Sequence, residues 1–343
     1  MVDEKFKYQL GKAAFIVWMN YCRRADTLCS IMDIKCVFIG DLIENRNIIW
    51  RLFFWVDYLY KAIRTSIFLL HYRPDIVLSQ SPPSFCPIIC WAYCTVFSKK
   101  FVIDAHNGAF ERPWIDVPFY LNVLRAATVV LIHNYDFKKY IEKKYVNINF
   151  FVLPDKIPAM PTKDTCDSPT KIFFLIVVVY QPDEPVIEIL EAAKEIVSSS
   201  QLNVVFKITG NYKRKMDIYR QYKDIKGIDF LGFIPDTEYQ QYLQDAYGII
   251  ALSTRSMVQQ CAAVEALGAG VPMIISDSVT ARKMFSKGAV MTKNDSKSIV
   301  RAIKEFCSKK SVLLEEIKEI KNFWEINWEN AYSEFLKLLI KTP

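Results

Sequence analysis

The stretch IDFLGFIPDTEYQQYLQDAYGIIALS, residues 228–253, decides the fold class. Its two ends, 228–234 and 247–253, are rich in apolar and β-branched side chains, which predicts a buried strand at each end. Residues 236–246 between them have a helical pattern that opens on Asp236, a favourable helix cap. A strand, a helix and a strand in this order predict a βαβ unit with parallel strands.

The same alternation continues along the chain in two series, separated by the stretch 154–170, which holds four prolines and lacks periodicity. We expect a linker here, at 156–169, with a doubly wound parallel sheet on each side of it. A chain of 343 residues is long enough for two such domains, because single cores stop growing near ~250–300 residues. Strands are predicted at 12–18, 35–40, 75–80, 100–107, 127–134 and 149–154 in the first series and at 171–180, 203–210, 228–234, 247–253 and 272–277 in the second, with closing helices near 296–307, 311–322 and 328–340.

The composition is that of a globular protein, with 52% hydrophobic and 24% charged residues, which excludes disorder. The net charge of +7 suits anionic lipid or phosphorylated ligands, but the chain has no long tract of like charges, so we expect no nucleic-acid partner. Nine cysteines without CxxC spacing predict reduced thiols in a cytoplasmic protein. The N-terminus lacks an apolar signal core, and the longest uncharged apolar run, 84–97, is too short to span a bilayer.

Polar residues just past the strand ends are the candidates for a binding site, since ligands of such sheets bind at the carboxyl ends of the strands. In LSTRSMVQQCAAVEALGAGVPMIISD, residues 252–277, a strand ends at Ser253 and a short loop leads into a helix predicted over 257–270. The start of that helix and Arg255 would suit phosphate, and Glu265 farther along it would accept hydrogen bonds from a diol such as a ribose. The alternative is a packed helix in which Glu265 forms a salt bridge.

The segment EALGAGVPMIISD, 265–277, resembles the Glu-Ala…Gly-x-Pro signature of the GT-B glycosyltransferases, in particular the family-4-like group. The blocks 228–255 and 81–110 look like further blocks of that group, and the likeness covers about 100–335. The resemblance implies an α/β GT-B fold, in which two Rossmann-like domains face each other across a cleft. The expected domains are an acceptor domain at 1–155, on which a C-terminal helix at 325–343 packs back, and a nucleotide-sugar donor domain at 170–324.

The resemblance also implies roles for single residues. Glu265 matches the glutamate that holds the donor ribose, and Arg255 and Ser256 fall in the loop near the donor phosphates. His106 matches a histidine beside the transferred sugar, where we expect it to hydrogen-bond a sugar hydroxyl or the reacting centre; the alternative is a structural histidine. The neighbours of His106 are expected to help it, with Asp104 orienting the ring, Gly108 permitting a tight turn, and Asn107 and Gly108 on the acceptor or phosphate side.

Two positions depart from the group's pattern. Met257 stands where many members carry a second glutamate, which leaves that contact with the sugar unfilled. The loop YQPDEP, 180–185, is acidic where many members carry the Arg and Lys that bind the diphosphate. The cations expected to replace them are Lys213, Arg214 and Lys215 just past Gly210, which ends a strand on the donor side, and Arg23 and Arg24 in the first helix of the N-terminal domain.

The segment 47–73 is both aromatic and basic. Its apolar members are Trp50, Phe53, Trp55, Val56, Leu59, Ile63 and Ile67, and its basic members include Arg51, Lys61, Arg64 and Arg73. We expect a core helix of the N-terminal domain. The alternative is an interfacial helix, which would place the protein against the inner face of the cell membrane and suit a lipid-linked acceptor.

The motifs together predict a hexosyltransferase-type glycosyltransferase. It would move a sugar from a nucleotide-diphosphate sugar to a hydroxyl of a glycan or lipid-linked glycan, as in polysaccharide biosynthesis, with retention implied by the resemblance. No D-x-D triplet occurs, so we expect no metal and no cofactor, and the motifs of P-loop, dinucleotide and nucleophile-elbow enzymes are absent from the sequence. The alternatives are a sugar-nucleotide epimerase or, more weakly, a glycan phosphorylase on the same fold, and a nucleotide-sugar-binding protein without catalysis.

Overall fold

The structure of the protein is a computed structural model that describes residues 11–42, 48–160, 172–199 and 202–341. The chain divides into two compact units. The first consists of Met1–Lys156 and Trp328–Pro343, and the second of Ile157–Asn327. Most of the linker expected at 156–169 lies outside the described residues.

Six parallel strands form the sheet of the first unit, in the order β2-β1-β3-β4-β5-β6. All residues of β1, β3 and β5 are buried, as expected for strands whose two faces are both covered. The order changes direction between β1 and β3, so the loops after these strands are the switch point at which ligands of such sheets bind. The strands are β1 Ala13–Val17, β2 Lys35–Phe38, β3 Ile76–Ser81, β4 Lys100–Ala105, β5 Val129–Ile132 and β6 Phe150–Val152, and the helices between them are α2 Arg23–Met32, α3 Ile48–Tyr72, α4 Phe85–Val96, α5 Tyr120–Ala126 and α6 Tyr135–Lys144.

The sheet of the second unit has six parallel strands in the order β12-β11-β10-β7-β8-β9. Its order changes direction between β7 and β10, which marks the corresponding switch point. The α/β class with two doubly wound parallel sheets, predicted from the strand and helix alternation, is confirmed. The strands are β7 Ile172–Ile176, β8 Val204–Thr209, β9 Ile228–Gly232, β10 Gly248–Ala251, β11 Met273–Ser276 and β12 Ala289–Thr292, and the helices are α7 Val186–Ser199, α8 Met216–Tyr222, α9 Asp236–Asp245, α10 Cys261–Ala269, α11 Val279–Met284 and α12 Ser296–Lys341.

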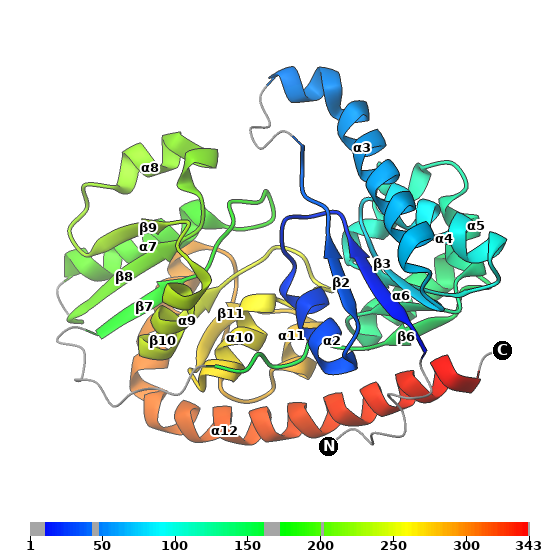
Figure 1. Cartoon of the computed structure of the whole chain (residues 1–343). Coiled ribbons are helices and arrows are strands. Elements are labelled where there is room, and N and C mark those ends of the chain that lie inside the picture. The colour runs from blue at the N-terminus through cyan, green and yellow to red at the C-terminus, as the bar shows by residue number, and fades with distance from the viewer. Residues whose placement is uncertain (1–10, 43–47, 161–171, 200–201, 342–343) are drawn as a thin grey trace. The chain divides into compact units, whose positions relative to one another are not determined.

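Helix α12 is one continuous helix of 46 residues, where three helices were predicted (Figure 1). The segment contains no glycine or proline, so nothing in its backbone ends the helix between the predicted pieces. The last part of α12 packs in the first unit. Lys100 Nζ donates a hydrogen bond of 2.7 Å to the carbonyl of Leu339, and the rings of Phe151 and Phe335 lie 6.1 Å apart.

Two other segments differ from their predictions. Helix α10 begins at Cys261 and not at 257, so Met257–Gln260 belongs to the loop after β10. Helix α3 is not the core helix that its apolar residues predicted, because several of them face solvent and its polar residues face inward. Within the described ranges, the chain has no helix that is both long and apolar enough to cross a membrane.

Candidate functional site

The switch point of the first unit lies beside two histidines that end neighbouring strands. His106 follows β4 and His133 follows β5, and the centres of their rings are 4.7 Å apart. An asparagine follows each histidine, and the side chain of Asn134 caps α6 by accepting a hydrogen bond of 2.8 Å from the N–H of Phe137. His106 was predicted as a site residue, and His133 was not. The repeated His-Asn pair at two predicted strand ends was the signal that could have found it.

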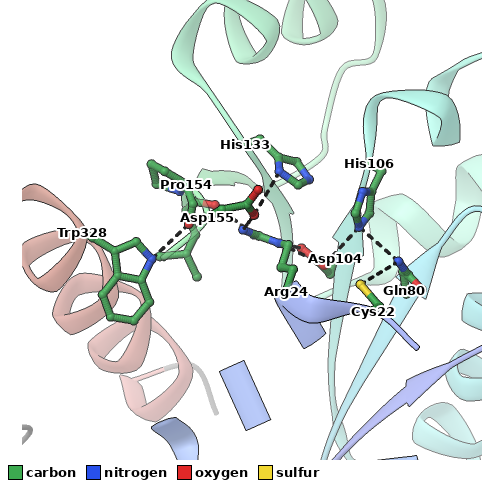
Figure 2. Close-up of polar contacts among 10 residues, drawn as sticks. Cys22, Arg24, Gln80, Asp104, His106, His133, Pro154, Asp155 and Trp328 are labelled. Atoms are coloured by element: carbon green, nitrogen blue, oxygen red, sulfur yellow. Dashed lines mark hydrogen bonds and ion pairs between the residues drawn. The ribbon is translucent and has the colours of Figure 1, made fainter. Parts of the chain in front are cut away.

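Arg24 joins these strand ends to the segment that leaves the sheet (Figure 2). Its Nε lies 2.9 and 3.1 Å from the two carboxylate oxygens of Asp104, at the end of β4. Its remaining nitrogens donate to Asp155 Oδ1 at 2.7 Å and to the carbonyl of Leu153 at 2.9 Å. We call Arg24, Asp104, His106, His133 and Asp155 the histidine cluster. Arg24 was predicted to reach a donor phosphate, but the structure places its guanidinium on these two buried carboxylates.

The charges of the cluster hold its carboxylates ionised. Burial alone would raise the pKa of Asp104 and of Asp155, but Arg24 and the neighbouring histidines together outweigh burial and hold both pKa values below their ordinary range. The pKa of Arg24 is raised in turn, because the two carboxylates outweigh the cost of burying the guanidinium. Asp104 and Asp155 carry two negative charges beside one arginine, which leaves a net negative charge for the histidines to meet.

The two histidines respond in opposite directions. Burial opposes protonation of His106, but Asp104, with Oδ2 3.6 Å from His106 Nε2, and the contact with Cys22 raise the pKa of His106 to about 10. Burial and the charge of Arg24 lower the pKa of His133, although Asp155 lies 3.5 Å from its Nδ1. At neutral pH the cluster therefore contains a cationic His106 beside a neutral His133.

Two buried polar atoms next to His106 lack a partner within the described part of the chain. They are Oε1 of Gln80, whose Nε2 lies 3.2 Å from His106 Nε2, and Nε2 of His133. The side chain of His106 itself is 32% exposed, so the cluster can be reached from solvent at this point. Buried polar atoms normally have partners, and a ligand that carries hydroxyl groups would provide them here.

The other N-terminal candidates lie at the same edge of the sheet. Arg23 is half-buried at the start of α2, and Asn107 and Gly108 form a short 3-10 helix just after His106. The tight turn expected at Gly108 does not require a glycine, because its φ lies outside the left-handed region and an added Cβ would lie 3.6 Å from Pro82, an ordinary contact. The predicted ligand contacts of these three residues stay predictions.

The segment that leaves β6 is held from two sides (Figure 2). Arg24 binds Leu153 and Asp155, while Trp328 of α12 donates its Nε1–H to the carbonyl of Pro154 at 3.0 Å. The ammonium of Lys156 lies 4.7 Å from the centre of the Trp328 ring. The histidine cluster is thus connected, through Asp155 and Pro154, to the last helix of the chain.

At the switch point of the second unit, the loop after β7 binds the loop after β10. The carbonyl of Asp183 accepts hydrogen bonds from the N–H and the hydroxyl of Thr254, at 2.7 and 3.1 Å. Its carboxylate accepts one from the hydroxyl of Ser253 at 2.8 Å and lies 3.6 Å from Nε of Arg255. Arg255 and its exposed neighbour Ser256 therefore occupy the predicted loop, but not the predicted helix start, since α10 begins at Cys261.

The side chain of Glu184 binds backbone N–H groups of the loop after β7. Its carboxylate accepts hydrogen bonds from the backbone N–H groups of Val179, at 3.0 and 3.1 Å, and of Gln181, at 2.8 Å. Burial, and to a lesser degree the nearby charge of Asp183, raise the pKa of Glu184 despite these bonds. Backbone N–H groups arranged around an anion form a site of the kind that phosphates also use, so this carboxylate takes up donors that an anionic ligand could otherwise use.

The predicted cations past β8 lie next to that loop. Arg214 donates a hydrogen bond of 3.1 Å to the carbonyl of Val179, and Lys215 is exposed at the start of α8. Gly210 comes close to the loop itself: its φ is 94°, and an added Cβ would lie 2.0 Å from the carbonyl oxygen of Val178. Only glycine fits this position.

Glu265 has a side-chain partner that the sequence analysis did not anticipate. The hydroxyl of Tyr239, on α9, donates a hydrogen bond of 2.5 Å to Glu265 Oε2. Both side chains are half-buried, so the carboxylate keeps access to solvent. A carboxylate has several acceptor positions, so Glu265 can accept hydrogen bonds from more than one donor.

Comparison with known proteins gives a consistent picture. Residues 170–309 match the family model described as glycosyl transferases group 1. Among solved structures, the chain is similar to sucrose-phosphate synthase from Thermosynechococcus elongatus, with 11% identity, a TM-score of 0.71 and coverage of 95% of this chain and 98% of that one. It is also similar to HepE from Anabaena in complex with UDP and glucose, with 12% identity, a TM-score of 0.70 and coverage of 95% and 99%.

A third similar structure is the pneumococcal O-GlcNAc transferase GtfA in complex with UDP and GlcNAc, with 9% identity, a TM-score of 0.62 and coverage of 81% of this chain and 60% of that one. Comparison with the curated protein sequences finds no match. At these identities the structures establish the fold, and the family match covers the second unit. The chain therefore has the GT-B fold and carries a glycosyl transferases group 1 domain in residues 170–309.

Proposed function

We propose that the protein transfers a hexose from a UDP-sugar to a hydroxyl group of a glycan or lipid-linked glycan, with retention at the anomeric carbon. The observation that carries the donor assignment is the convergence of Asp183, Ser253 and Arg255 at the switch point of the unit that matches the family model. UDP is proposed because the similar structures of HepE and GtfA hold it. Retention and the hexose are supported by the resemblance in sequence.

For the donor, we propose that Glu265 accepts hydrogen bonds from the ribose and that Arg255 and Arg214 face the diphosphate, with Lys215 and Ser256 beside them. The pair between Arg255 and Asp183 is long, at 3.6 Å, and the arginine is 42% exposed. Such a pair is weak, so a doubly charged diphosphate could draw Arg255 away from Asp183.

For the transfer, we propose that His106 acts as a hydrogen-bond donor and a positive charge beside the sugar, not as a base. A pKa of about 10 keeps it protonated at neutral pH, so it has no lone pair with which to remove a proton. The unpartnered His133 Nε2 would accept a hydrogen bond from a sugar hydroxyl. Cations and backbone N–H groups would meet the charge of the leaving group, and we propose a reaction without a metal or another cofactor.

A thermal-shift panel of UDP, GDP, ADP and their sugars tests the donor assignment. A ligand present at about 100 times its Kd stabilises a protein by about 2.7 kcal/mol, so UDP and its preferred sugar are expected to raise Tm while GDP and ADP are not. The variant Glu265→Ala is expected to lose the UDP shift with an unchanged Tm in the absence of nucleotide. A full UDP shift in that variant would contradict the role given to Glu265.

A second candidate function is a nucleotide-sugar-binding protein that does not transfer. Glu184 favours it, because this carboxylate occupies N–H groups beside the loop in which related enzymes carry cations. Product analysis with the best-binding UDP-sugar separates the possibilities. Release or transfer of the sugar supports the enzyme, binding without turnover supports the second candidate, and an altered sugar nucleotide formed without acceptor indicates an epimerase.

A further inference from the structure

Helix α3 exposes an apolar surface that the transfer reaction does not use. At ~3.6 residues per turn, its exposed apolar residues fall within an arc of about 120° along one side of the helix. Each of them is about half exposed or more, which is unusual for so many large apolar side chains in one row. These residues, the apolar stripe of α3, are Trp55 (61%), Val56 (49%), Leu59 (61%), Ile63 (50%), Ile67 (60%) and Leu70 (54%).

The opposite side of α3 is polar and buried. Asp57, Lys61 and Thr65 are 2%, 3% and 0% exposed. Lys61 Nζ lies 2.7 Å from Asp57 Oδ2 and 2.5 Å from Asp41 Oδ1, and Trp18 donates its Nε1–H to Thr65 Oγ1 at 2.9 Å. Turning the stripe inward would break this buried ion pair and leave charges without partners, which is strongly unfavourable. The exposure of the stripe is therefore determined by the packing of α3.

The apolar surface continues past the helix. An open pocket of about 540 Å³ lies between Trp55 and residues of α4 and the loop before α5, including Phe85, Ile88 and Val117. Next to it, Phe119 is 72% exposed and has a φ of 65°, a left-handed conformation that side chains rarely adopt. The strained backbone directs a large apolar side chain into solvent beside the end of the stripe.

The charges on α3 are positive where they meet solvent. The helix contains one acidic residue, Asp57, and it is buried. Among the side chains of α3 that the structure describes, Arg64 is exposed along the border of the stripe, 3.5 Å from the hydroxyl of Tyr60. An apolar arc of this width, with Trp55 within it and Arg64 beside it, fits the interface of an anionic bilayer, where the apolar side enters the lipid and arginine meets the headgroups.

We propose that the apolar stripe of α3, together with the pocket at Trp55 and Phe119, docks the protein on a membrane that contains anionic lipid. The helix lies in the plane of the interface, and the stripe from Trp55 to Leu70 covers about 22 Å of it at ~1.5 Å per residue. The proposal rests on the packing of the first unit and does not depend on the donor. It gives the proposed reaction on a lipid-linked acceptor the surface at which to occur.

Sedimentation with sucrose-loaded vesicles tests the proposal on the full chain. We expect binding to vesicles of phosphatidylcholine mixed with phosphatidylglycerol and weaker binding to phosphatidylcholine alone. Ile63→Glu places a charge in the stripe and is expected to lower the affinity for the mixed vesicles by at least about tenfold. Arg64→Gln removes one cation near the surface and is expected to lower it by about fivefold on the mixed vesicles, with little change on the neutral ones.

Ile187→Glu, at a site on α7 of the second unit with 51% exposure, is the matched control and should bind vesicles as the unchanged protein does. The proposal fails if the protein does not bind the mixed vesicles, or if Ile63→Glu and Ile187→Glu behave alike. It also fails if Ile63→Glu dissociates a dimer without affecting vesicle binding, since the stripe would then contact a second copy. Measuring the UDP shift in Tm for each variant separates a failure of docking from a failure of the donor assignment.

Discussion

Glu265 shows how a single residue gains its partner from outside its own segment. In the sequence it stands alone among small apolar residues, which pointed to a ligand as its partner. In the folded chain the hydroxyl of Tyr239 already meets it at 2.5 Å. The tyrosine fixes the position of the carboxylate and leaves part of it accessible to a ribose, so the two residues are expected to act together.

Tyr239→Phe removes that hydrogen bond and keeps the ring. A hydrogen bond to a charged group contributes ~1.5–3 kcal/mol, but this one is present with and without UDP, so only part of it bears on affinity. The variant is expected to bind UDP about two- to tenfold more weakly, while Glu265→Ala loses more than about tenfold. Isothermal titration calorimetry measures both. Tyr242→Phe, one turn along the same helix, is the control and should bind UDP normally; an equal loss in that variant would show that the effect comes from α9 as a whole.

Asp104→Asn tests the electrostatics of the histidine cluster. Removing the carboxylate charge is expected to lower the pKa of His106 from about 10, because burial, which disfavours the imidazolium, is then opposed by the contact with Cys22 alone. An NMR titration of histidine ring carbons can follow this directly, since the chain has 3 histidines. A His106 that titrates identically in both proteins would contradict the assigned interaction.

The same interaction has a consequence for stability. The pKa of His106 is higher in the folded than in the unfolded chain. Its contribution to the free energy of unfolding is therefore complete below pH ~6.5 and is lost as the pH rises towards 10. The free energy of unfolding, from urea titrations, should therefore fall over this range in the unchanged protein. His106→Gln should show a flatter dependence, and parallel curves would contradict the assignment.

At this scale the sequence predicted types of residue better than their partners. His106, Arg24 and Glu265 were selected as candidate site residues from their type and position, but Arg24 meets Asp104 and Asp155, which are 80 and 131 positions away along the chain. Local patterns carry no information about pairs so distant. The hydrogen bonds of Asp183 with the loop after β10 were missed for the same reason.

Among the secondary-structure elements, periodicity predicted where strands and long helices lie in the sequence. It did not predict which side of a helix faces the core. The buried strands β1, β3 and β5 were found because parallel strands are apolar throughout. Strand β12 and helices α8 and α11 were not predicted, since they are only 4, 7 and 6 residues long and show little periodicity. The apolar residues of α3 suggested the core, but only the tertiary ion pair of Lys61 shows which side of that helix faces inward.

Three glycines at loops and helix ends allow a graded test of backbone constraint. Gly210 has a φ of 94° and no space for a Cβ, Gly270 has a φ of 68° and nothing within 4 Å, and Gly108 has neither constraint. Substitution by alanine is expected to lower the free energy of unfolding by about 1–2 kcal/mol at Gly270, because of the left-handed conformation alone. The loss should be larger at Gly210, where the backbone of Val178 must move. Gly108→Ala should change the free energy of unfolding by less than about 0.5 kcal/mol.

Urea denaturation of the three alanine variants measures this order. Gly210→Ala is also expected to weaken UDP binding, because the displaced loop carries the carbonyl that Arg214 uses. Equal losses at Gly210 and Gly270 would show that the contact with Val178 is relieved at no cost, and the close approach of the two loops would then be unnecessary for stability.

For the whole molecule, the last part of α12 is essential to the first unit. Trp328, Tyr332, Phe335, Leu336 and Leu339 are each 2% exposed or less. Burying such side chains contributes about 1.5–3 kcal/mol each, which together approaches the ~5–15 kcal/mol that stabilises a typical domain. A chain that ends after Asn327 is therefore expected to keep a folded second unit and to lose a stably folded first unit.

Hydrogen exchange followed by mass spectrometry distinguishes the two units in this truncated chain. Exchange should rise in the strands β1 to β6, and the peptides of β7 to β12 should keep their protection. Uniform protection across the truncated chain would mean that residues beyond Asn327 add little to the first unit, and that Trp328 binds Pro154 without supporting the sheet.

The division of α12 between the units also sets the order of events during synthesis. Residues up to Lys156 leave the ribosome first, yet their partners Trp328 to Leu339 leave it after the whole second unit. The nascent first half must wait, with the surface intended for α12 uncovered, while about 170 residues are added at ~5–20 residues per second. This interval of about 9–34 seconds is the period in which a chaperone would have most to protect.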